Sequence, residues 1–446
     1  MRMTSKKIIK NHGLILFCAF LVLSALSVRA EQRLTVSDVR QLALEFNRQY
    51  LSAREDVAIA QTDISRARGD AFPEINFNGN YNRNFTIPKV FFIANGETME
   101  LQTGFKNSFG ASVSVRQPIW HGGKVFTALK VAKMYKRYAE AIAGRVEAEV
   151  EYTAEQLFYA SVLARAQLSV IQQAYESNSA NLDVVEKQYS QGVVSEYEVL
   201  RARVEKQNLL PQLIAAEAEV ELSEKRLKSF LGIELDEPTV LVEEVTDTSM
   251  ANVPSLETLT DSALAVRPEI EQARELVSIS EKAIRVARAD YWPNLDAVGA
   301  YNWQSASDDF TLRGNESSSW TAGLTVSLPI FDGGKTRALV TQRKAENRQA
   351  RLNLKQAEDN ITLEVEEAYT ALLQAKRALD VQGATIASAE EGLRIARVRY
   401  ESGVGTQLEV LSAQTALTDA RTAMAQALYG FRVARAGIRK ATTLEI

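Results

Sequence analysis

The sequence is nearly free of the residues that build disulfides, thiolate metal sites and histidine-based catalytic centres. It holds one cysteine, Cys18, and two histidines, His12 and His121, in 446 residues. Cys18 and His12 fall in an N-terminal segment that we expect to be removed, so the mature chain would form no disulfide and no zinc site built on several histidines. We interpret His121 as a polar turn residue. No paired carboxylates with a histidine or metal partner support catalysis, so we expect no enzyme activity and no cofactor.

Long apolar runs are also scarce, and the one at the N-terminus has the pattern of a signal peptide. Basic residues up to Lys10 precede an apolar run at 14–26, and Val28-Arg29-Ala30 offers a small-residue cleavage site. We therefore expect residues 1–30 to be a signal peptide and the mature chain to leave the cytoplasm. A retained membrane anchor is disfavoured because the apolar run is shorter than a full span.

Acidic residues outnumber basic ones, which is unusual for a protein that binds nucleic acid. Without the five basic residues of the predicted signal peptide, 47 lysines and arginines face 56 aspartates and glutamates, a net charge of −9. Proteins that bind nucleic acid usually present a basic surface. We therefore expect no nucleic-acid partner.

What the sequence does contain is an internal duplication. The segment Pro118-Ile-Trp-His-Gly-Gly-Lys returns 211 residues later as Pro329-Ile-Phe-Asp-Gly-Gly-Lys. Pro118 lies 71 residues before Tyr189, and Pro329 lies 71 residues before Tyr400. Because unconstrained loops would have drifted in length, we predict two structural repeats, 31–238 and 256–446, joined by a linker at 239–255.

Each repeat begins with a helical pattern, which Pro73 or Pro293 ends, and continues with alternating apolar and polar residues. Four stretches of about ten residues show this alternation, which is the length of a tilted transmembrane β-strand. Lipid headgroups attract aromatic side chains at the ends of such strands. We expect this position for all four tryptophans, Trp120, Trp292, Trp303 and Trp320.

The connection between the strands is nine residues longer in the first repeat than in the second. It carries an apolar run at 90–94, which could fold over a pore mouth or contact lipid. After the strands, the first repeat reads as helix from Gly123 to about Tyr189, and again from Gly192 to about Leu231. The first of these helices would be about 100 Å long, so we expect antiparallel hairpins that pack lengthwise as coiled coils.

Two glycine pairs mark the passage from strand to helix. Gly333-Gly334-Lys335-Thr336 resembles the end of a phosphate-binding loop, but Pro329 stands where that loop needs a glycine. We interpret the prolines and glycines of this motif as strand-to-helix turns. They are Pro118, Gly122, Gly123, Pro329, Gly333 and Gly334.

A third repeated motif joins the two long helices of each hairpin. Gly192 and Gly403 each follow a tyrosine by three residues and precede a glutamate, Glu198 or Glu409, by six. The spacing predicts a tight turn with Tyr189 and Tyr400 packed at its base. The two glutamates either contribute to function or lie on solvated helix faces, and the sequence leaves both alternatives open.

Taken in order, these motifs resemble the TolC family of outer-membrane efflux proteins over nearly the whole mature chain. Two further segments add to the resemblance, Arg267-Pro268-Glu269 and Leu231-Gly232-Ile-Glu-Leu235. The resemblance implies an α+β membrane protein. Four β-strands per chain would complete a 12-stranded barrel in a homotrimer, and the helical hairpins would form a coiled-coil tunnel in the periplasm.

The resemblance also implies roles for the hairpin tips. Gly192, Val193, Val194, Gly403, Val404 and Gly405 would contact a periplasmic adaptor, the membrane fusion protein. Glu409 and Glu198 would ring the periplasmic entrance. The chain departs from some relatives at two points: Ser412 replaces a second acidic residue, and Gly405 stands where a basic residue is often found. The first departure would weaken the attraction of the entrance for cations.

The expected function is therefore a passive exit duct in the bacterial outer membrane. It would carry substrate from an inner-membrane transporter of the RND or ABC type, reached directly or through the adaptor, and its barrel would contact outer-membrane lipid. One alternative is the exit duct of a type I protein-secretion system, served by an ABC exporter. An alternative of another class is a soluble periplasmic coiled-coil scaffold. The substrate, the pump class and the latch of the closed state are not encoded in recognisable motifs.

Overall fold

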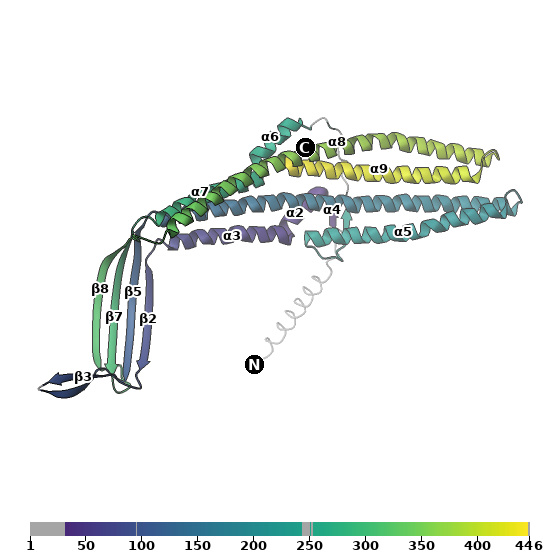
Figure 1. Ribbon diagram of the computed structural model, residues 1–446. Helices are drawn as coiled ribbons and strands as arrows, with labels where there is room; N and C mark the ends of the chain where they lie inside the picture. The colour runs from purple at the N-terminus through teal and green to yellow at the C-terminus, as the bar shows by residue number, and fades with distance from the viewer. Residues whose placement is uncertain (1–31, 95, 243–249, 251–252, 445–446) are drawn as a thin grey trace, which may run out of the picture. The chain divides into compact units, whose positions relative to one another are not determined.

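The computed structural model describes residues 32–94, 96–242, 250 and 253–444. In this part the chain is an α+β protein with long helices and three separate β-sheets (Figure 1). Its elements are β1 (Gln32–Leu34), α2 (Val36–Phe46), α3 (Arg48–Gly69), β2 (Glu74–Arg83), β3 (Lys89–Ala94), β4 (Glu97–Gln102), β5 (Asn107–His121), α4 (Lys124–Ser190), α5 (Glu196–Leu231), β6 (Thr239–Leu241), α6 (Leu256–Val266), α7 (Pro268–Ala289), β7 (Asn294–Ser307), β8 (Asn315–Ser327), α8 (Lys335–Glu401) and α9 (Gln407–Thr442).

The helices of the two halves match in length. Helices α2 and α6 have 11 residues each, α3 and α7 have 22, α4 and α8 have 67, and α5 and α9 have 36. The long helical hairpins predicted from the sequence are confirmed. Among the helices that the structure describes, none combines the length and apolarity needed to cross a lipid bilayer.

Polar side chains fix where several helices begin. At α2, Thr35 and Asp38 form a capping box, in which the Thr35 hydroxyl accepts from Asp38 N at 3.2 Å and Asp38 Oδ2 accepts from Thr35 N at 2.9 Å. The hydroxyls of Ser255 and Thr406 cap α6 and α9 in the same way, each accepting a backbone N–H of the first turn. These caps satisfy donors that the helix itself leaves unpaired.

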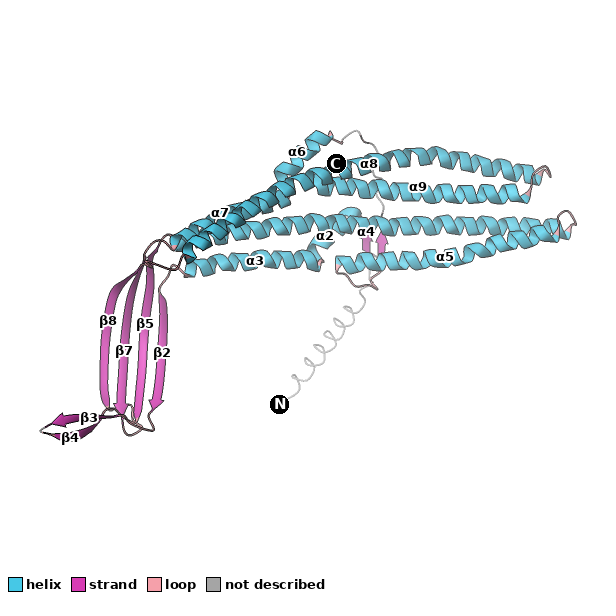
Figure 2. Ribbon diagram, viewed as in Figure 1, coloured by secondary structure: helices cyan, strands magenta, loops and turns pink. Residues whose placement is uncertain are grey.

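Strands β2, β5, β7 and β8 form an antiparallel sheet in that spatial order (Figure 2). Their register aligns residues of the same kind: Phe77 pairs with Val113, Val113 with Tyr301, and Tyr301 with Trp320. Because side chains alternate between faces, most apolar positions of all four strands fall on one face and most asparagines, serines and threonines on the other. The apolar face includes Ile75, Phe77, Tyr81, Phe109, Ala111, Val113, Val115, Ala297, Tyr301, Trp303, Trp320, Ala322, Leu324 and Val326.

A β-bulge changes the direction of β5 near its end. The pairing with β7 shifts between Pro118 and Trp120, so that Trp120 lies opposite Leu295, while Leu295 lies opposite Val326 on the apolar face. Without the bulge, the alternation would direct Trp120 to the polar face. The bulge therefore brings Trp120 to the apolar side, where its ring meets that of Trp292 edge to face at 6.1 Å.

The predicted strand-end position is wrong for two of the four tryptophans. Trp120 and Trp292 do lie where strands meet helices, but Trp303 and Trp320 lie within β7 and β8. Strand β8 includes the serine-rich run 317–319. In the structure it pairs with residues 302–304 and lengthens both strands. The longer connection of the first repeat is also more ordered than a loop, because residues 89–102 form the β3–β4 hairpin.

The long hairpins close through apolar seams. Helices α4 and α5 pack through Leu182, Val185, Val199 and Ala202. Helices α8 and α9 pack through a seam near the tip and a second one farther along the hairpin. Burial of these side chains at helical spacing is what holds two such long helices together. The seam residues of α8 and α9 are Leu372, Leu379, Leu393, Ala396, Val410, Phe431 and Ile438.

The chain divides into two compact units that cut across the sequence repeats. A sheet unit holds residues 53–144 and 268–360, and a helical unit holds the described residues of 1–52, 145–267 and 361–446. Each predicted repeat, 31–238 and 256–446, therefore contributes to both units.

Two predicted segments fall wholly or partly outside the described residues. The predicted signal peptide 1–30 lies outside them, as do residues 243–249 and 251–252 of the predicted linker 239–255. The linker is not wholly irregular, because β6 pairs in parallel with β1 within the helical unit.

Candidate functional site: the hairpin tips

The first tip is the turn between α4 and α5. Gly192 adopts φ +71°, the left-handed conformation that favours glycine. The backbone N–H groups of Gly192 and Val193 donate to the carbonyls of Tyr189 and Gln188, both at 2.9 Å. Val193 is 68% exposed at the apex, whereas Val194 packs against the apolar seam of its hairpin.

The second tip repeats this geometry with different side chains. Gly403 has φ +74°, and the N–H groups of Val404 and Gly405 both donate to the Arg399 carbonyl, at 3.0 and 2.9 Å. A side chain at Gly405 would meet Arg399 at 2.9 Å, so the turn closes tightly there. Val404 is 69% exposed. Each tip therefore presents one valine to solvent beside a rigid, hydrogen-bonded turn.

The two tip tyrosines, which the sequence places alike, differ in the structure. Tyr400 packs on Leu393, Ala396 and Val410 beneath the second tip. Tyr189 is 47% exposed, so the expected packing under the first tip is wrong for this residue. In the first tip, Val194 packs against the apolar seam instead of the tyrosine ring.

Hydrogen bonds join the two tips within one chain. The Tyr400 hydroxyl donates to Gln188 Oε1 at 2.9 Å, linking α8 to α4. The Gln407 side chain donates to the Glu198 carbonyl at 3.2 Å, linking α9 to α5, and Gln407 is buried. Hydrogen bonds of this kind are directional, so they fix how one tip lies against the other.

The two candidate entrance carboxylates have different surroundings. Glu409 is half exposed and pairs with Arg399, with 3.3 Å between Oε2 and Nε. Glu198 is partly buried beside Tyr400. Burial, and after it the Glu198 carboxylate, raise the pKa of Tyr400 above its usual range. Ser412 is exposed on α9 and adds no charge. Of the two candidate entrance carboxylates, Glu409 is therefore largely compensated and Glu198 is sheltered.

A polar layer that the sequence analysis missed connects the hairpins farther from the tips. The Ser177 hydroxyl on α4 accepts from both Arg397 and Gln414, each at 2.8 Å. Arg421 donates to Gln173 of α4 at 2.7 Å and to Glu390 of α8 at 3.0 Å. These residues are ordinary polar types without a motif, so only their proximity in space identifies them. All of them except Glu390 line a cavity of about 180 Å³ between α4, α8 and α9.

At the strand-to-helix turns of the sheet unit, glycines adopt left-handed conformations in both repeats. They are Gly122, Gly123, Gly333 and Gly334, with φ of +60°, +78°, +68° and +83°. The polar residue before each glycine pair, Asp332 or His121, makes different contacts in the two repeats. Asp332 accepts the N–H groups of Gly334 and Thr336, both at 2.8 Å, and so caps the start of α8. His121 instead lies 3.1 Å from Asp296 of β7.

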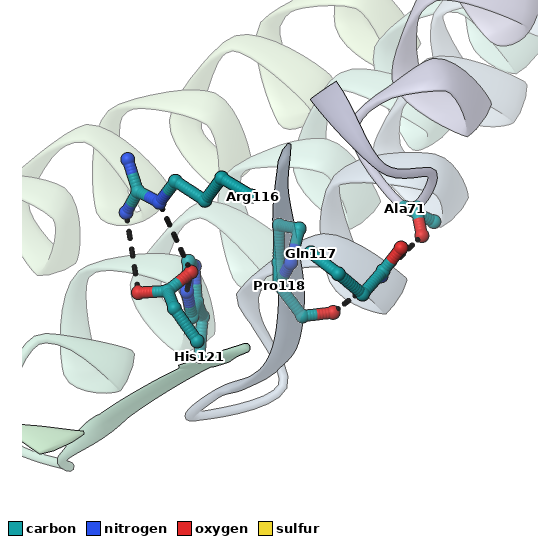
Figure 3. Close-up of polar contacts among 6 residues, drawn as sticks. Ala71, Arg116, Gln117, Pro118 and His121 are labelled. Atoms are coloured by element: carbon teal, nitrogen blue, oxygen red, sulfur yellow. Dashed lines mark hydrogen bonds and ion pairs between the residues drawn. The ribbon is translucent and has the colours of Figure 1, made fainter. Parts of the chain in front are cut away.

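Asp296 also binds Arg116, so that three charged or polar groups meet beside the first turn. Arg116 donates to both Asp296 oxygens at 3.2 Å, and His121 approaches the same carboxylate (Figure 3). On the other side of the strand, Gln117 donates to the carbonyls of Ala71 and Pro118. His121 is thus a structural residue of the turn, as the sequence suggested. Among the described residues, no cluster of three or more His, Cys, Asp or Glu could hold a metal ion.

Comparisons with known proteins agree with this architecture. A family model described as outer membrane efflux protein matches residues 39–233 and 259–443. Nodulation protein T of Rhizobium leguminosarum bv. trifolii is 23% identical over 392 residues, covering 84% of this chain and 78% of that protein. Outer membrane protein TolC of Vibrio cholerae is 21% identical over 417 residues, covering 91% and 90%.

Solved structures show the shared fold. The Campylobacter jejuni CmeC outer membrane channel superposes with a TM-score of 0.75 at 20% identity, over 91% of this chain and 85% of that channel. The family match covers both repeats, with their sheet strands and helical hairpins. The chain therefore belongs to the outer membrane efflux protein family, whose members are outer-membrane channels with a periplasmic helical part and not enzymes.

Proposed function

We propose that the protein is the trimeric exit duct of a tripartite efflux pump. The observation that carries this proposal is the sheet of β2, β5, β7 and β8, which is apolar on one face and polar on the other. In the described part of the chain, its outer strands β2 and β8 each pair on one side only. Open strand edges are not tolerated in lipid, because their backbone groups would lack hydrogen bonds.

Further copies of the same chain satisfy these edges most simply. Strand β8 of one copy would pair with β2 of the next, and three copies would close a ring of 12 strands. The apolar face would then contact lipid, and the asparagines, serines and threonines would line a water-filled passage. A passage lined in this way does not discriminate between solutes, so selectivity would belong to the pump.

The helical hairpins supply the periplasmic part of the duct. The exposed valines at the tips, Val193 and Val404, offer small apolar contacts at the ends of rigid turns, which suits docking of a periplasmic adaptor. The adaptor would connect the duct to an inner-membrane transporter of the RND or ABC type. Energy for transport would come from that transporter, and the duct itself would be passive.

Two measurements test the proposal. Native mass spectrometry of the protein in detergent should give three copies, and a monomer would overturn the duct. A photo-crosslinking residue at Val404, used in intact cells, should capture a periplasmic adaptor. The matched control is the same residue at Val381, which is 63% exposed on α8 away from the tip, and it should not capture the adaptor.

The identity of the captured adaptor also separates the two kinds of export. An adaptor that serves a drug or ion pump supports efflux. An adaptor that serves a peptide-exporting ABC transporter would replace efflux by protein secretion. If Val404 captured outer-membrane proteins alone, the tip assignment itself would be wrong.

A further inference from the structure

The β3–β4 hairpin of the sheet unit has an apolar face that no described residue covers. Val90 pairs with Leu101, and Phe92 pairs with Met99, so these four side chains lie together on one face. Each is between 44% and 55% exposed. The other face carries Phe91 and Ile93 together with an ion pair between Lys89 and Glu100. The first face is thus apolar apart from Glu97 beside the turn, whereas the second face mixes apolar and charged side chains.

A two-stranded hairpin of this kind needs a surface to pack on. Isolated hairpins are at best marginally stable in water, and large apolar side chains favour burial. The hairpin leaves the sheet at the strand ends remote from the helices of the sheet unit (Figure 2). In an outer-membrane channel with periplasmic helices, those strand ends lie at the outer leaflet.

The apolar face of the sheet reaches the strand ends from which the hairpin leaves. There, Tyr81, Phe109 and Phe310 form an aromatic cluster with ring centroids 5.0–5.6 Å apart. Phe85 lies two residues after the end of β2 and is 93% exposed. Aromatic clusters at such a position are typical of the membrane–water interface.

We propose that the β3–β4 hairpin is a membrane arm, whose face of Val90, Phe92, Met99 and Leu101 lies on the acyl chains of the outer leaflet. The inference rests on the proposed function, because it requires the apolar sheet face to contact lipid. The occupant of the apolar face is therefore lipid, continuous with the lipid that surrounds the sheet.

The polar side of the sheet does not match the hairpin. A cavity of about 600 Å³ at this end is lined on that side by Asn80, Ser108, Gln304 and Ser317, among others. If the hairpin folded across the passage, its apolar face would lie against these amides and hydroxyls and would leave them without hydrogen bonds. On the lipid side, acyl chains would give the apolar face of the hairpin the apolar contacts that it lacks.

The depth of the arm follows from its backbone. In the described part of the chain, β3 and β4 pair only with each other, so each has an open edge. Unpaired backbone groups are unfavourable in the hydrocarbon core but are satisfied by water and headgroups at the interface. The arm therefore lies in the plane of the interface, with the Lys89–Glu100 pair on its outward, wet face.

Site-directed spin labelling of the full-length protein in lipid vesicles tests this arrangement. The only cysteine, Cys18, lies in the predicted signal peptide, so one introduced cysteine gives a single label on the mature protein. Phe92→Cys reports the apolar face, and Phe91→Cys reports the opposite face of the same hairpin. Leu324→Cys on the apolar sheet face and Ser112→Cys on its polar face are the matched controls.

We expect the ratio of oxygen to nickel-chelate collisions at position 92 to be several-fold higher than at 91 and 112, and close to that at 324. Free access of the nickel chelate to 92 would show a hairpin in water and overturn the arm. Protection of 92 from both reagents would show packing against protein, such as a second copy, and would also overturn it. If position 324 itself were not in lipid, the proposed function would fail. A lipid-exposed 324 with a water-exposed or protein-covered 92 would refute the arm alone.

Discussion

Adding one methyl group to Gly122 tests the account of the strand-to-helix turn. Gly122 has φ +60°, and a Cβ atom there would lie 2.7 Å from the Ala289 carbonyl oxygen and 3.1 Å from its Cα. Gly333, its counterpart 211 residues later, has φ +68° and nothing within 4 Å of the same added atom. The two positions share the backbone conformation and differ in what an added methyl group would meet.

The expected magnitudes follow from this difference. A left-handed conformation is unfavourable by about 1–2 kcal/mol for a residue with a side chain, so both Gly122→Ala and Gly333→Ala should lower the free energy of unfolding by that amount. Overpacking against backbone that cannot move aside adds about 1–3 kcal/mol. Gly122→Ala should therefore be the more destabilising variant, by about 1–3 kcal/mol.

The assay is equilibrium unfolding of the protein in lipid vesicles with urea, followed by tryptophan fluorescence. The edge-to-face pair of Trp120 and Trp292 lies beside Gly122 and makes the signal sensitive to this turn. Equal effects of the two substitutions would refute the close approach of the turn to Ala289. A larger effect of Gly333→Ala would refute the account as a whole.

Three further predictions concern the second tip. Tyr400→Phe removes the hydroxyl that links the hairpins, and the lost hydrogen bond contributes about 0.5–1.5 kcal/mol. Channel openings in planar bilayers should therefore become more frequent. An unchanged opening rate would contradict a role of this bond in holding the tips together. Because the pKa of Tyr400 is raised in the folded protein, its contribution to stability is fully present below about pH 10, the usual tyrosine pKa, and is lost as pH rises above it. The unfolding midpoint of the wild type should therefore fall relative to that of Tyr400→Phe as the pH rises above about 10, and a constant difference would argue against the burial. Arg399→Gln removes the partner of Glu409 and should shift the reversal potential in a salt gradient toward cations, and an unchanged reversal potential would contradict a place for Glu409 at the entrance.

The sequence predicts the helices and the sheet well because each depends on a pattern that the chain repeats. Apolar and polar residues alternate in phase along all four strands, so the pairing register follows once two faces are distinguished. The glycines that end α4 and α8 require a left-handed backbone, and this fixes the tips to within a few residues.

What the sequence could not predict depends on contacts between residues far apart in the chain. The inter-hairpin bonds of Ser177, Gln188 and Gln407 involve common polar residues at positions that only the packing of four helices brings together. Tyr189 and Tyr400 stand in matching motifs, yet Val194 packs on the seam of one tip and the Tyr400 ring on the seam of the other. Equivalent positions in a duplicated chain therefore need not have equivalent surroundings.

The equal lengths of the paired helices constrain how this chain can change. Deleting one heptad from α4 alone would move Gln188 about 10 Å along its helix and break its bond to Tyr400. The same deletion in α4, α5, α8 and α9 together would leave every contact between the hairpins in register. Insertions and deletions in the hairpins are therefore acceptable only as matched sets, whereas the connections between strands can change singly. A shorter or longer version of this channel would have to be engineered by altering both halves of the duplication in step.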